Sequence, residues 1–141
     1  MKKLFSIAII LALSACSHEP QPILYGKDAC DFCKMTIMDK RFSSECMSKK
    51  GKIFKFDDAH CLLTFLKVGG VWSNEVAGIY FSDYMGSEGW INSDKAFFLK
   101  SQGLKSPMGG NIAAFSSKGE RDTIEQKFTG EKLSWEEIKT K

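Results

Sequence analysis

Residues 42–56 show the clearest alternation of apolar and polar positions in the chain. Phe42, Cys46 and two serines alternate with Ser43, Glu45 and Met47, and a second apolar run follows at 53–56. The intervening sequence KKGK, residues 49–52, has the composition of a turn, and Gly51 is free to adopt positive φ. The pattern predicts a β-hairpin.

A helix is expected directly after this hairpin. Asp57 and Asp58 can cap the segment AHCLLTFLK, residues 59–67, in which three leucines and a phenylalanine form one apolar face. Gly69 and Gly70 then end the helix. The first half of the domain, about 29–75, is therefore predicted as strand–strand–helix.

The last third of the chain shows a similar plan. Residues 111–116 are expected as a strand, 117–119 as a turn, 121–128 as a second strand or mixed segment, and 129–132 as a bend. Ser134 and Glu137 form a capping box that opens a closing helix. Strands over 78–83 and 96–100, with a loop at 86–89, connect the halves. We therefore predict an α+β domain of two pseudo-repeated ββα halves, about 29–75 and 76–141.

The N-terminus has the character of an export signal. Lys2 and Lys3 precede an apolar run at 4–13, which is too short to span a bilayer. The run ends in Leu-Ser-Ala-Cys, which resembles a bacterial lipobox and implies acylation of Cys16; an ordinary signal peptide is the alternative. We expect a signal peptide at 1–15, a lipidated tether at 16–28 and a domain at 29–141. Ser17 favours the periplasmic face of the outer membrane.

Composition and charge narrow the classes of function. The sequence is 43% hydrophobic and 12% aromatic, as expected for a folded domain. Loss of Lys2 and Lys3 with the signal peptide lowers the formal charge from +3 to +1. No stripe of basic residues alternates with aromatic residues, so we expect no nucleic-acid partner.

The candidate chemistry lies in the sequence CDFCKM, which contains Cys30, Cys33 and Met35. Cys46 and Cys61 complete four cysteines that could instead form two disulfides in an exported protein. A thioredoxin-like redox site is disfavoured because no clear strand precedes Cys30. A structural zinc site is disfavoured because the chain has no second close pair of cysteines. Thiolate and thioether sulfur together select Cu(I), for which two or three ligands suffice.

Met108 is a second candidate ligand. It lies in the sequence SPMGG, where the neighbouring glycines cannot shield its thioether. If the two halves pack about a pseudo-two-fold axis, Met35 and Met108 can flank one site. Core packing is the alternative role for each methionine.

Several separated motifs together resemble the NosL family, the copper-carrying lipoproteins of nitrous-oxide reductase assembly. They are the lipobox, the Cys-x-x-Cys-x-Met sequence, Phe-Asp-Asp before a helix containing Cys61, Asp-Tyr followed by Trp-Ile-Asn, and Ser-Pro-Met-Gly-Gly before Ala-Phe. The resemblance implies a non-enzymatic Cu(I) chaperone with a fold similar to that of organomercurial lyase. Cys33, Met35 and Met108 would be ligands, with Cys30 assisting. Expected partners are apo nitrous-oxide reductase, its ABC-type accessory membrane complex and the membrane. The protein could also form a homodimer.

One departure and two rival functions accompany this interpretation. Members of the family commonly have glycine where this chain has Lys34, whose ammonium group we expect to point to water. The enzymatic alternative is a thiol-based redox or organometal-cleaving enzyme, with Cys30, Cys33 and Asp57 converging on a carbon–metal bond. The remaining alternative is a surface lipoprotein that binds zinc or is held by disulfides.

Overall fold

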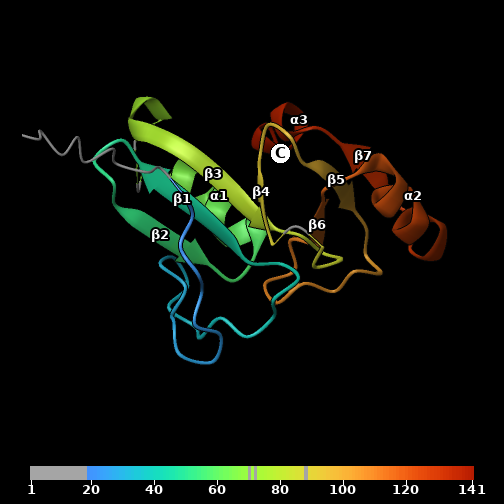
Figure 1. Ribbon diagram of the computed structural model, residues 1–141, viewed down its shortest axis with the longest axis horizontal. Helices are drawn as coiled ribbons and strands as arrows, with labels where there is room; N and C mark the ends of the chain where they lie inside the picture. Colours follow the sequence, from blue (N-terminus) through green and yellow to red (C-terminus); the bar gives the residue numbers. More distant parts are fainter. Residues whose placement is uncertain (1–18, 70, 72, 88) are drawn as a thin grey trace, which may run out of the picture.

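The computed structural model describes residues 19–69, 71, 73–87 and 89–141, and it confirms the α+β class (Figure 1). The N-terminal half contains β1 (Ser44–Ser48), β2 (Ile53–Phe56), α1 (Ala59–Lys67), a 3₁₀ turn η1 (Ser73–Glu75), β3 (Val76–Ser82) and β4 (Trp90–Asn92). This half extends to residue 92, past the boundary expected near residue 75, because β3 and β4 join the first sheet. The C-terminal half contains β5 (Phe97–Lys100), β6 (Ile112–Phe115), α2 (Lys118–Lys127), β7 (Glu131–Leu133) and α3 (Trp135–Lys139). The predicted first hairpin and the helix after it are confirmed.

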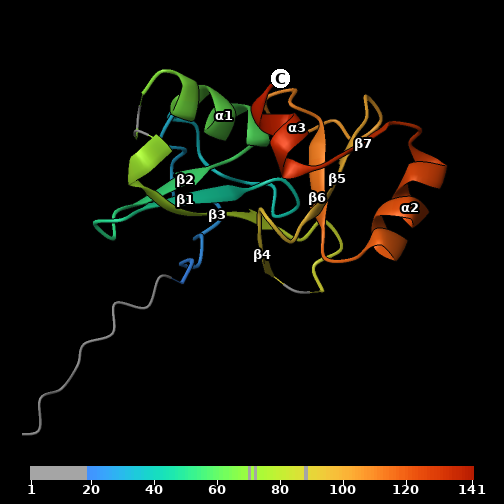
Figure 2. The ribbon, with the colours of Figure 1, turned by 90° about the horizontal axis from the view of Figure 1, so that it is seen from above.

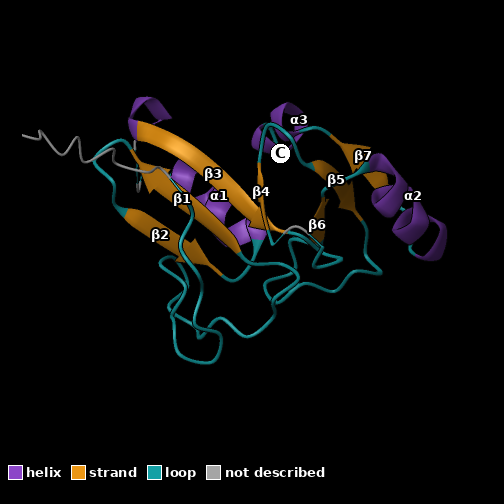
Figure 3. Ribbon diagram, in the orientation of Figure 1, coloured by secondary structure: helices purple, strands orange, loops and turns teal. Residues whose placement is uncertain are grey.

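Two sheets of related topology organise the fold (Figure 3). Their strand orders are β2-β1-β3-β4 and β6-β5-β7, and all ladders are antiparallel. Each half contains a β-β-α-β unit whose first strand is central in the sheet. β1 lies between β2 and β3, and β5 lies between β6 and β7. The second hairpin is therefore formed by β5 and β6, one strand earlier than the sequence pattern suggested.

The sequence-based prediction for residues 117–132 was wrong. Residues 118–127 form α2, and Ser117 is its N-cap, accepting the Glu120 backbone N–H at 3.2 Å, rather than part of a turn. Ile124 is the one buried residue of α2, so this helix shows no apolar stripe that would distinguish it from a mixed segment. Residues 131–133 form β7 on β5 instead of a bend. The capping box of α3 is confirmed.

The two halves share a hydrophobic core. Figure 2 shows α1 on one face of the four-stranded sheet, with α3 beside it, and α2 flanking the smaller sheet. Phe81 of β3 packs its ring edge-on against Phe98 of β5 and Trp135 of α3, at centroid distances of 5.0 and 5.6 Å. A smaller core lies against α2, and Phe42 from the first half is part of it. The halves therefore form one domain.

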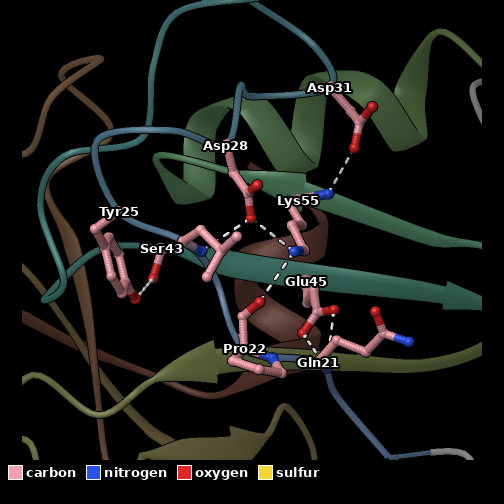
Figure 4. A network of polar contacts seen from close by, with 9 residues as sticks. Gln21, Pro22, Tyr25, Asp28, Asp31, Ser43, Glu45 and Lys55 are labelled. Atoms are coloured by element: carbon pink, nitrogen blue, oxygen red, sulfur yellow. Dashed lines mark hydrogen bonds and ion pairs between the residues drawn. The ribbon is translucent and has the colours of Figure 1, made fainter.

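Part of the expected tether is docked on this domain (Figure 4). The Gln21 backbone N–H donates to both carboxylate oxygens of Glu45 at 3.0 and 3.1 Å. Lys55 Nζ donates to the Pro22 carbonyl at 3.0 Å, and Ile23 is buried in the core. The chain is thus fixed to β1 and β2 from Gln21 onward. The signal peptide and Cys16 lie outside the described residues, and none of the described helices has the length and apolar character to cross a membrane.

Candidate metal centre

Three thiols and one carboxylate converge near the first turn of α1. The sulfur atoms of Cys30, Cys33 and Cys61 and a carboxylate oxygen of Asp57 all lie within 4.8 Å of one another. Cys30, Cys61 and Asp57 are buried, whereas Cys33 is partly exposed. The cluster is therefore closed toward the core and opens to solvent at Cys33.

The loop that contains Cys30 and Cys33 is held by its own backbone. The Cys30 N–H donates to the Met35 carbonyl at 2.8 Å, and the Lys34 N–H donates to the Cys30 carbonyl at 3.0 Å. Asp31 fixes this loop to the outer edge of β2: its N–H donates to the Lys55 carbonyl, and its carboxylate accepts the Lys55 N–H at 2.7 Å. The two thiols are thereby placed beside the end of β2.

Lys34 has the backbone conformation that explains why glycine suits its position. Its φ is 65°, in the left-handed region that carries a steric cost for any residue with a Cβ. Its Nζ donates to the Asp31 carbonyl at 2.6 Å. Lys34 is exposed to solvent, as expected, and its ammonium group closes the loop at the surface.

The other two members of the cluster come from the start of α1. Asp58 is the N-cap, and its Oδ1 accepts the His60 N–H at 2.8 Å. Asp57 immediately precedes the cap, and Cys61 lies in the first turn of the helix. Cys33 Sγ lies 3.6 and 3.7 Å from the two Asp57 oxygens, as a thiol donor. The capping of α1 therefore sets the positions of both Asp57 and Cys61.

Asp58 also joins the second half of the domain to this site. Its Oδ2 accepts hydrogen bonds from Ser106 Oγ at 2.5 Å, the Met108 N–H at 2.9 Å and the Gly110 N–H at 3.4 Å. A Cβ at Gly110 would lie 2.3 Å from Asp58 Oδ1, so only glycine permits this close approach. One buried carboxylate thus caps α1 and anchors the turn that contains Met108.

Burial keeps two of the thiols protonated. It raises the pKa of Cys30 to about 11 and raises that of Cys61 strongly, with hydrogen bonding to Asp57 adding to the rise at Cys61. A thiolate is the form that binds metal, so a soft cation must displace these protons when it binds.

The structure brings some of the predicted ligands together. Cys30 and Cys33 belong to the cluster. Met35 lies in the same loop with 58% of its surface exposed, and Met108 is half-buried against the core that Cys33 also contacts.

Two cysteines outside the predicted set have different surroundings. Sequence reasoning did not assign Cys61 as a ligand; the signal that could have found it is its place three residues after the Asp58 cap. Cys46 is buried in β1, where it pairs with Phe54 of β2 and Ile79 of β3, and it is not a member of the cluster. None of the four described cysteines is paired in a disulfide.

The fold and the site together define a small α+β domain with a sulfur-rich candidate metal centre. The sequence matches the NosL family over residues 22–141, and the chain belongs to that family. Its structure is similar to that of the copper chaperone NosL from Shewanella denitrificans, with a TM-score of 0.72 and 21% identity, covering 84% of this chain and 94% of that one. No curated protein matches the sequence.

Proposed function

We propose that this chain is a membrane-anchored Cu(I) chaperone that delivers copper to nitrous-oxide reductase during its assembly. The observation that carries the proposal is the cluster of three thiols and Asp57 within 4.8 Å, open to solvent at Cys33. Thiolate sulfur favours Cu(I) over hard cations such as magnesium and calcium.

The ligand set that we propose is Cys33, Met35 and Met108, with Cys30 assisting and Cys61 as an additional thiol. Met35 lies five residues from Cys30 on a loop closed by backbone hydrogen bonds, and Asp58 holds the Met108 backbone beside the first turn of α1. A neutral thioether binds Cu(I) without releasing a proton, so the two methionines suit a cation that must later leave. Ligand exchange with a recipient would begin at the exposed side, where Cys33 and Met35 lie.

Acylation of Cys16 would anchor the protein to the periplasmic face of the outer membrane. Its partners would be apo nitrous-oxide reductase and the ABC-type accessory membrane complex. Support for these partners and for the anchor comes from the family and the lipobox.

An anaerobic Cu(I) titration of the reduced mature protein, with Cys16 replaced by serine, against a chelator of known affinity tests the proposal. We expect one tightly bound equivalent, with affinity reduced at least tenfold by Cys33→Ser, Met35→Ala and Met108→Ala. Met38→Ala is the matched control, because Met38 is also an exposed methionine, at 68%, and is not a proposed ligand. Undiminished Cu(I) binding by Cys33→Ser would refute the ligand assignment.

Delivery requires its own measurement. Copper-loaded protein mixed with apo nitrous-oxide reductase and the accessory complex should restore reductase activity faster than the same amount of chelated copper. Equal rates from both copper sources would contradict the chaperone role even where binding is tight.

Zinc binding is a second candidate function, because Cys61 and Asp57 can take the place of the second close cysteine pair that the sequence lacks. Three cysteines and one aspartate form a complete four-ligand set for tetrahedral Zn²⁺. The two metals give different ligand dependences: Zn²⁺ binding should be lost in Asp57→Asn and unaffected by Met108→Ala, whereas Cu(I) binding should depend on Met108.

A further inference from the structure

The turn between β1 and β2 concentrates positive charge at one end of the domain. Lys49, Lys50 and Lys52 of this turn, here called the lysine turn, are all exposed. Together with Ser48, Phe54, Val71 and Glu75 they line a hollow of about 460 Å³. Lys52 Nζ lies 4.7 Å from the centroid of the Phe54 ring.

The chemistry of this hollow is that of a site for an anionic amphiphile. Three lysines line it together with the buried apolar residues Phe54 and Val71, and Glu75 is the one acidic residue among the described residues of its lining. Val71 also lines a neighbouring hollow to which Lys67, in the last turn of α1, contributes a further ammonium group. Phosphate groups with hydrocarbon beneath them, as in an anionic phospholipid, match this arrangement.

The proposed lipid anchor lies within reach of the same end of the domain. Gln21 is fixed to Glu45 of β1, and Cys16 precedes it by five residues, which span at most about 17 Å. From Glu45 to Lys49 the strand advances about 13 Å. An acylated Cys16 and the lysine turn can therefore meet the same membrane surface.

The candidate metal centre lies at the opposite end of this hairpin. Lys52 directly precedes β2, whereas Asp57 directly follows it, and α1 then runs back from the metal centre toward the turn (Figure 1). With the lysine turn against the membrane, the partly exposed Cys33 would face away from the membrane.

We propose that the lysine turn binds anionic phospholipid headgroups and, as a second membrane contact beside the acyl anchor, orients the metal centre away from the membrane. This inference rests on the proposed acylation for its biological setting, although binding of the lysine turn to lipid does not require it. A basic patch that contacts anionic headgroups is a recognised membrane signal beside a lipid anchor.

The test is partitioning of mature protein with Cys16 replaced by serine onto vesicles of phosphatidylcholine containing 30% phosphatidylglycerol, as against phosphatidylcholine alone. Each lysine near such a surface contributes about fivefold in partitioning, so K49Q/K50Q/K52Q should lower binding by about 100-fold. The matched control, K27Q/K105Q/K127Q, removes the same charge from exposed lysines elsewhere and should change binding by less than threefold. High salt should abolish binding of the unsubstituted protein.

Amine labelling read by mass spectrometry supplies a second measurement without substitutions. On anionic vesicles the acylated protein should lose most of its labelling at the lysine turn while Lys27 and Lys34 stay reactive. Equal effects of the two triple variants, or protection of Lys34 in place of the lysine turn, would overturn the proposal. Copper binding is measured separately: a chain that partitions as expected but binds no Cu(I) refutes the chaperone proposal and leaves the lipid contact standing.

Discussion

Replacing Asp58 with serine should separate the capping of α1 from the positioning of Met108. Serine is a good N-cap and is the residue that caps α2 at the equivalent position, Ser117. Its shorter side chain can keep the bond to the His60 N–H but cannot also reach the turn that contains Met108. The substitution therefore removes one function of Asp58 and preserves the other.

The expected loss of stability follows from the hydrogen bonds that disappear. The buried carboxylate of Asp58 accepts from Ser106 Oγ at 2.5 Å and, in a partly buried bond, from the Met108 N–H at 2.9 Å. Hydrogen bonds to charged groups contribute about 1.5–3 kcal/mol each and are not additive. We expect Asp58→Ser to lower the free energy of unfolding by about 2–4 kcal/mol, which leaves a domain of ordinary stability folded.

Copper affinity is the more informative readout. A misplaced Met108 should weaken Cu(I) binding by about 10- to 100-fold, the usual effect of removing a group that orients a ligand. In the double variant Asp58→Ser/Met108→Ala, affinity should fall no further than in Met108→Ala alone, because both changes remove the same ligand. Ser117→Ala is the control: it should cost about 1 kcal/mol of stability and leave copper binding unchanged.

Two results would refute this reasoning. Tight Cu(I) binding by Asp58→Ser, in a protein whose affinity does fall on Met108→Ala, would show that the turn positions Met108 without Asp58. Additive losses in the double variant would show that Asp58 acts on the metal through another path.

Three further predictions concern backbone strain and a buried charge. Gly110→Ala should lower stability by about 1–3 kcal/mol in urea unfolding because of its contact with Asp58, whereas Gly119→Ala, which meets no atom within 4 Å inside α2, should raise it by up to about 1 kcal/mol. Lys34→Gly should raise the free energy of unfolding by about 1 kcal/mol through relief of positive φ; a lower melting temperature would count against that cause. Burial raises the pKa of the Glu45 carboxyl group from its usual 4.5 to about 6. The free energy of unfolding should therefore fall by about 2 kcal/mol as pH rises through this range and Glu45 ionises in the core. Glu45→Gln should remove that loss in unfolding measured at pH 4.5 and pH 7.5, and an unchanged pH profile would exclude Glu45 as its source.

The sequence predicts the first half of the fold better than the second for a physical reason. The segment that forms α1 has a continuous apolar face and a strong cap, so its local pattern and its packing agree. The segment that forms α2 buries only Ile124, and its helix depends on the Ser117 cap and on helix-favouring charged residues, which periodicity does not detect. The short strand β7 is defined by its ladder with β5, a long-range contact that no local pattern shows.

The residues of the candidate site also differ in how far the sequence predicts them. Cys30 and Cys33 were evident because they share one short loop. The sequence placed Asp57 beside them only in the enzymatic alternative, and it did not assign Cys61 as a ligand. The cap of α1 and the pairing of Asp31 with Lys55 bring these residues to the loop. Asp58 and Met108 are 50 residues apart in the sequence, so the hydrogen bond that anchors the Met108 turn is evident only from the structure.

Asp31 has a consequence for solubility that is independent of copper. β2 is the outermost strand of its sheet, and such an edge presents unpaired backbone groups on which another chain can assemble. The loop between the two thiols occupies part of that edge, since Asp31 satisfies both the N–H and the carbonyl of Lys55. Any movement that takes this loop away from β2 therefore exposes an edge strand that can pair with another chain. Protein whose loop is oxidised, alkylated or proteolysed should thus be prone to aggregation.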